Sequence, residues 1–87
     1  MSSTENKAKA HEMKAEIRKG KTVFLVTREG YLKVKQVIIH NGGDITVKTY
    51  IEKTYKYSSE EQRLEFISVE IESEMKYLIS RRENRRK

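Results

Sequence analysis

Hydrophobic and polar residues alternate along residues 44–57, and this is the clearest pattern in the chain. Ile45, Val47 and Ile51 fall on one side of the alternation. Polar residues fall on the other side, namely Thr46, Lys48, Tyr50, Glu52, Thr54 and Lys56. Strict alternation is typical of a strand with one buried face and one solvated face. The pattern therefore predicts one strand from about Asp44 to Tyr57.

Two further strands are predicted before it. Residues 22–27 form a short run rich in β-branched and aromatic residues, and residues 31–39 alternate at first and then lose the pattern. In the second run the apolar residues of one face are Leu32, Val34 and Ile38, and Val37 and Ile39 interrupt the alternation. The connections at 28–30 and 40–43 are short and contain glycine, which favours hairpins and an antiparallel meander of three strands.

The N-terminal segment predicts a helix over residues 4–19. Ala10, Met13 and Ile17 recur at intervals of three and four residues, which gives a narrow apolar stripe. Gly20 stands where a glycine commonly ends a helix.

The C-terminal segment predicts a second, longer helix. Ser58 and Ser59 precede Glu61 and Gln62 at the spacing of a capping box. The apolar residues that follow share about a third of a helical circumference, namely Leu64, Ile67, Ile71, Met75, Leu78 and Ile79. An alternative stays open for residues 64–72, because Ile67, Val69 and Ile71 also alternate with polar residues as a fourth strand would.

These elements predict a single α+β domain over residues 1–87, with the order α-β-β-β-α and frayed ends at 1–4 and 83–87. Both helices are expected on one face of a three-stranded sheet, since a sheet this small needs such a cover. The expected core joins Leu32, Val34, Ile45, Val47 and Ile51 to Leu64, Ile67, Ile71 and Leu78, with Met13 and Ile17 added. The element order resembles that of double-stranded RNA-binding domains in topology alone. The acidic start of the last helix departs from the basic start of that family, so no family is identified.

The chain is basic, with a formal net charge of +6 and a pI of about 9.6. This balance favours an anionic partner, DNA or RNA first among them. The longest apolar run is far too short to cross a membrane, so no membrane partner is expected. The absence of cysteine fits a reducing compartment, and we expect a cytoplasmic protein.

The polar face of the predicted sheet is the main candidate for a nucleic-acid interface. If the alternation holds throughout, five cationic and aromatic residues share that face: Lys33, Lys35, Lys48, Tyr50 and Lys56. Lysines neutralise phosphates and release counterions, and a tyrosine among them can stack on an unpaired base.

The basic C-terminal tail is the second candidate, with Arg81, Arg82, Arg85 and Arg86 expected to contact phosphates. Residues 58–80 hold two basic and six acidic residues, so the chain is bipolar in charge. Phe66 and Tyr77 fall outside the apolar stripe of the predicted last helix, where exposed aromatic residues can contact a partner. The alternative function is therefore a small inhibitor or adaptor of the kind that phages and mobile elements encode, acting on a protein partner. A homodimer is a further option.

Catalytic chemistry has little support, and we expect no enzyme, no cofactor and no metal. His11 and His40 are far apart in the sequence, and no cysteine or second histidine stands at metal-ligand spacing. A ribonuclease-type reaction that combines His40 with Tyr50 or Lys48 is the remaining enzymatic alternative.

Overall fold

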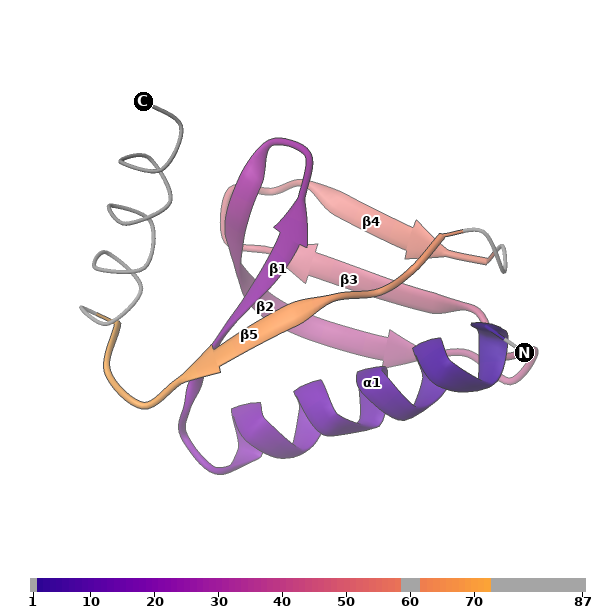
Figure 1. Ribbon diagram of the computed structural model, residues 1–87, viewed down its shortest axis with the longest axis horizontal. Coiled ribbons are helices and arrows are strands. Elements are labelled where there is room, and N and C mark those ends of the chain that lie inside the picture. Colours follow the sequence, from indigo (N-terminus) through magenta and orange to yellow (C-terminus); the bar gives the residue numbers. More distant parts are fainter. Residues whose placement is uncertain (1, 59–61, 73–87) are drawn as a thin grey trace.

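The computed structural model describes residues 2–58 and 62–72, which form one helix and a five-stranded antiparallel sheet (Figure 1). The elements are α1 (Ser2–Arg18), β1 (Thr22–Thr27), β2 (Gly30–Ile39), β3 (Ile45–Thr49), β4 (Thr54–Tyr57) and β5 (Phe66–Val69). The strand order is β4-β3-β2-β1-β5, so the chain makes a meander of four strands and then returns to pair with its first strand. In Figure 1, β1 and β5 run at a steep angle to β3 and β4, and β2 connects the two parts.

Helix α1 forms where the apolar stripe predicts it. Ala10 and Met13 are fully buried against the sheet, and Ile17 packs beside them. The helix ends at Gly20, whose φ of 89° is in the left-handed region. The N–H groups of Gly20 and Lys21 donate to the carbonyls of Ile17 and Glu16, at 3.0 and 3.1 Å. This is the Schellman arrangement that a glycine in the C′ position supports, and it confirms the predicted helix end.

The predicted C-terminal helix is wrong for the residues that the structure describes, and the strand alternative is confirmed. Residues 66–69 form β5, which pairs antiparallel with β1 through Leu25↔Phe66 and Val23↔Ser68. The predicted three-stranded sheet is therefore a five-stranded one, and the resemblance in element order to double-stranded RNA-binding domains does not hold. Residues at 64, 67 and 71 fit a helical stripe, but residues 67, 69 and 71 fit a strand equally well. The outer edge of β1 decides between them, because it offers a ladder of backbone hydrogen bonds. The predicted helical positions Met75, Leu78 and Ile79 lie outside the described residues.

The predicted single strand over 44–57 is in fact the hairpin of β3 and β4. The Thr49 N–H donates to the Lys53 carbonyl at 3.0 Å, and the Glu52 N–H donates to the Thr49 carbonyl at 3.2 Å. Paired residues, such as Val47↔Tyr55 and Ile45↔Tyr57, are both odd-numbered. The alternation of apolar and polar residues therefore continues in phase through the turn, so it does not mark where the chain reverses.

The main core lies between α1 and one face of the sheet. It contains the buried residues Ala10, Met13, Val23, Leu25, Val34, Val37, Ile45, Val47 and Leu64. Most of the predicted core is found there, but two predicted members are exposed: Ile51, at the β3–β4 turn, and Ile71. Ile67 is also outside this core, because it packs with Phe24, Val69 and Tyr31 in a smaller cluster on the opposite face.

A buried asparagine fixes the segment that leads into β5. Asn6 of α1 is only 3% exposed. Its Nδ2 donates to the Gln62 carbonyl at 2.7 Å, and its Oδ1 accepts from the Leu64 N–H at 2.9 Å. One amide side chain thus binds two backbone groups, including the buried Leu64 N–H that would otherwise be unpaired, and it holds Leu64 in the core.

Candidate nucleic-acid interface

The sheet face opposite α1, called the open face below, carries four of the five residues that were predicted to share the polar face of the sheet. Val34 pairs with Thr49, and both are buried on the side that faces α1. Their neighbours Lys33 and Lys48 must therefore project from the open face. Lys56 joins them, because it pairs with Thr46, which lies two residues from Lys48. Lys48 and Lys56 are exposed, and neither forms an ion pair with another described residue.

Tyr50 lies beside Lys33 at one end of this face. The Tyr50 N–H donates to the Lys33 carbonyl at 3.1 Å, and the Lys33 Nζ lies 5.1 Å from the centre of the Tyr50 ring. This is a cation–π contact, and it orients a ring that is still 57% exposed. Lys33 also forms an ion pair with Glu72 at 3.5 Å, so part of its charge is already compensated. The uncompensated charge of the open face therefore comes mainly from Lys48 and Lys56.

Lys35 does not belong to the same row, which corrects the prediction of one five-residue face. The register between β2 and β3 shifts between Val34 and Gln36, where the structure has a β-bulge at Lys35. A bulge adds one residue to a strand and reverses the alternation after it. Val37 thereby joins Val34 in the core, while Ile38 changes to the open face. Lys35 instead lines a hollow between β2 and α1.

A shallow hollow lies at the other end of the open face, beside Lys48 and Lys56. Its volume is about 580 Å³, and its lining residues are Ile38, His40, Asp44, Ile45, Thr46, Lys48, Lys56 and Ser58. The ring of His40 contacts the Thr46 hydroxyl, with 2.8 Å between Nε2 and Oγ1. Two ammonium groups, an imidazole and hydroxyl groups therefore surround a partly apolar floor, together with the carboxylate of Asp44. The two lysines give this lining one net positive charge, which suits the phosphate and sugar of a nucleotide.

The pairing of His40 with Tyr50 finds no support in this arrangement, whereas Lys48 lines the same hollow as His40. His40 precedes β3 and Tyr50 follows it, which separates them by about 20 Å of extended chain. A direct proton transfer between them is excluded at that separation, since it requires hydrogen-bond distance. No group of three metal-ligating residues occurs within 2–58 and 62–72.

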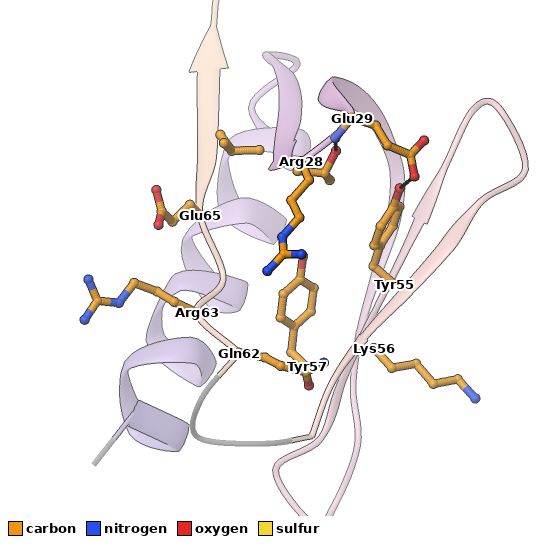
Figure 2. A pocket seen from close by; sticks show the side chains of 10 residues that line it. Arg28, Glu29, Tyr55, Lys56, Tyr57, Gln62, Arg63 and Glu65 are labelled. Carbon is orange, nitrogen blue, oxygen red and sulfur yellow. Dashed lines mark hydrogen bonds between the residues drawn. The ribbon is translucent and has the colours of Figure 1, made fainter.

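A larger hollow lies elsewhere, between the β1–β2 turn, β4 and the segment before β5 (Figure 2). Its volume is about 760 Å³, and sequence reasoning gave no sign of it because its lining comes from three distant segments. Figure 2 shows the Arg28 guanidinium and the Tyr57 hydroxyl pointing toward each other across it, while Lys56 and Arg63 point away. Burial, with a contribution from Tyr55, raises the pKa of Tyr57 above its ordinary value. The lining includes the carboxylates of Glu29 and Glu65, so the hollow is not of one charge.

Of the two residues predicted to contact a protein partner, the structure describes Phe66 and not Tyr77. Phe66 is part of β5, is half-buried and packs against the main core, so the helix on which it was predicted to be exposed is absent. Tyr77 lies outside the described residues, and so do the tail arginines Arg81, Arg82, Arg85 and Arg86.

Comparisons with protein-family models, curated proteins and solved structures find no match to this chain. Within the described residues, no helix is long and apolar enough to cross a membrane.

Proposed function

We propose that this protein binds single-stranded nucleic acid through its open face and has no enzymatic activity of its own. The observation that carries the proposal is the grouping of Lys48, Lys56 and the exposed Tyr50 ring on one side of the β3–β4 hairpin. Ammonium groups neutralise phosphates whatever the base sequence, and an aromatic ring stacks on an unpaired base. A base inside a duplex is already stacked, so the ring favours a single strand.

Lys33 has a positioning role in this proposal. Its cation–π contact with Tyr50 covers one side of the ring, so a base would stack on the other side. The predicted phosphate contacts of Arg81, Arg82, Arg85 and Arg86 would extend the interface. The absence of cysteine supports a cytoplasmic location as part of the same proposal.

Fluorescence anisotropy with labelled oligo-dT, oligo-U and a DNA duplex, each at several salt concentrations, tests the proposal. We expect the unmodified protein to bind both single strands more tightly than the duplex. The double variant Lys48→Gln/Lys56→Gln should make the negative slope of log K against log salt shallower by about 1.4, because each contact to a single-strand phosphate contributes about −0.7.

The matched control is Lys7→Gln/Lys9→Gln, which removes the same charge from α1, on the opposite side of the sheet. This control should leave the slope close to that of the unmodified protein. If nothing binds at low salt, or if both double variants make the slope equally shallower, the open face is not a nucleic-acid interface.

A protein partner is the second candidate function, and one observation favours it. Ile51 and Tyr50 stand next to each other at the tip of the β3–β4 hairpin and are 56% and 57% exposed. Exposed large apolar residues are common contact points in protein interfaces. A partner that is recovered from nuclease-treated lysate with the unmodified protein, and lost with Ile51→Ser, would favour this function over nucleic-acid binding.

A further inference from the structure

A second cationic cluster lies apart from the open face, in the hollow between the last two turns of α1 and the bulged part of β2. This α1–β2 hollow has a volume of about 390 Å³ and is lined by Lys14, Ile17, Arg18, Lys35, Gln36 and Val37. Three of its six lining residues are cationic and none is acidic. We propose that the α1–β2 hollow binds a phosphate-type oxyanion, independently of the function proposed for the open face.

The β-bulge is the first support for this site. Without it, Lys35 would follow the alternation of β2 and project beside Lys33. The register shift between Val34 and Gln36 instead places Lys35 next to cationic residues of α1. Bulges commonly redirect one side chain near functional sites, and this one gathers three like charges despite their mutual repulsion.

The lack of internal compensation is the second support. The nearest acidic residue in the sequence of α1 is Glu16, and its carboxylate pairs with Lys19 at 3.5 Å and with Lys21 at 3.4 Å. Within the described residues, Lys14, Arg18 and Lys35 form no ion pair. The positive charge of the hollow is therefore left for an external anion.

The helix dipole opposes an anion at this place, but its effect is smaller than that of the side chains. A helix C-terminus carries about half a negative charge. Here the N–H groups of Gly20 and Lys21 already pair with the carbonyls of Ile17 and Glu16. Three full positive charges outweigh the remaining dipole.

The chemistry of the donors points to phosphate rather than carboxylate. Arg18 offers a planar pair of N–H donors, and Lys14 and Lys35 offer ammonium groups. A tetrahedral anion with three or four oxygens can accept from all of them, while a carboxylate has only two oxygens. The phosphate group can belong to a small phosphorylated molecule or to the backbone of a nucleic acid, since Gln36 also pairs with Lys48.

An NMR titration of the isotope-labelled protein with sodium pyrophosphate, at constant ionic strength set by sodium chloride, tests the site. We expect saturable shifts of the backbone amides of Arg18, Lys35, Gln36 and Val37. Lys35→Gln should weaken the affinity by about tenfold, the effect of removing one charged hydrogen bond. Arg18→Gln, on the other element, should weaken it at least as much.

Lys7→Gln is the matched control, because it removes one charge from an exposed position of the same helix. Its affinity for pyrophosphate should stay within twofold of the unmodified protein, and that of Lys48→Gln/Lys56→Gln should do the same. Linear shifts that do not saturate, or an equal loss in Lys7→Gln and Lys35→Gln, would overturn the proposal.

Oligo-dT added to the pyrophosphate complex separates the two sources of phosphate. If it displaces pyrophosphate from the shifted residues, the site takes a nucleic-acid backbone. If the pyrophosphate shifts persist, the site takes a small phosphorylated molecule. Since pyrophosphate binding is measured without nucleic acid, the site and the open-face function stand or fall separately.

Discussion

The two halves of the sheet use their open faces differently. In the half made of β5, β1 and the start of β2, that face is apolar: Phe24 and Val69 are buried there, and Tyr31 and Ile67 pack around them. In the half made of the end of β2, β3 and β4, the same face carries Lys48 and Lys56, both exposed. One half is therefore packed on both faces and stabilises the fold. The other carries exposed lysines on its second face, and this is the half in which the proposed binding takes place.

Phe24→Ala gives the largest effect that we expect, because it breaks the packed half. Removing a buried phenyl ring costs about 3–5 kcal/mol of unfolding free energy, a large part of the total for a domain this small. Urea denaturation followed by circular dichroism measures this loss. Phe24→Leu, which keeps most of the volume, should lose less than about 1.5 kcal/mol. Lys48→Gln/Lys56→Gln should stay within about 0.5 kcal/mol of the unmodified protein. A comparable loss in the lysine variant would contradict the division between the halves.

Tyr50→Ala sharpens the comparison from the binding side. Loss of one base-stacking ring should weaken single-strand binding by about 1–3 kcal/mol, measured by anisotropy at fixed salt. The unfolding free energy should change little, since the ring is more than half exposed. Tyr50→Phe keeps the ring and serves as the control, with binding close to normal. Equal weakening in the alanine and phenylalanine variants would show that the hydroxyl, and not stacking, makes the contact.

A substitution in the β3–β4 turn should have a smaller effect of opposite sign, an increase in the unfolding free energy. Glu52 has a φ of 64°, which a residue with a side chain adopts only at a cost. Glu52→Gly should stabilise the protein by about 0.5–1 kcal/mol, measured in the same urea experiment.

Gly43 is the matched position in the turn between β2 and β3. Its φ is 94°, and its turn has the same pair of backbone bonds: His40 N–H to the Asp44 carbonyl, and Gly43 N–H to the His40 carbonyl. Gly43→Ala should lose about 1 kcal/mol through backbone strain alone, because nothing stands within 4 Å of an added Cβ. The interpretation fails if Glu52→Gly destabilises the protein.

Glu29→Gln tests the ion pair that connects the β1–β2 turn to the β3–β4 turn. Its effect on stability should be the smallest of those predicted here. Glu29 lies in the β1–β2 turn and pairs with Lys53 in the β3–β4 turn. The hydrogen bond from Lys53 and its charge hold the pKa of Glu29 below its ordinary value. A lowered pKa means that the carboxylate stabilises the fold above its ordinary pKa, and that this contribution is lost as the pH falls through the folded-state pKa.

The urea midpoint of the unmodified protein should therefore fall more between pH 5 and pH 3 than that of Glu29→Gln. Glu12→Gln, which removes an exposed carboxylate of α1 with no ion pair to the described residues, should keep the full pH dependence. If the urea midpoints of Glu29→Gln and of the unmodified protein fall by the same amount, the Glu29–Lys53 ion pair does not contribute to stability.

The places where sequence reasoning failed share a physical cause. Thr49 and Lys53 close a hairpin whose paired residues have the same parity, so the alternation passes through the turn without a break. No glycine marks that turn, because Glu52 occupies the left-handed position. The alternation is interrupted at Val37 and Ile39, and this irregularity indicates a bulge nearby. It does not identify Lys35 as the extra residue.

The amino-acid sequence by itself determined the local features of this protein: α1 and its glycine end, the first two strands, most of the core, and the lysines of β3 and β4. These depend on propensity, capping and periodicity, which act over a few residues. Only the tertiary structure decided that residues 66–69 form a strand, that Lys35 leaves the open face for α1, and that Arg28 and Tyr57 face one hollow. Each of these depends on contacts between segments far apart in the chain. The conformation of such a segment is stabilised by the segment that it packs against, and the pattern of its own residues does not decide it.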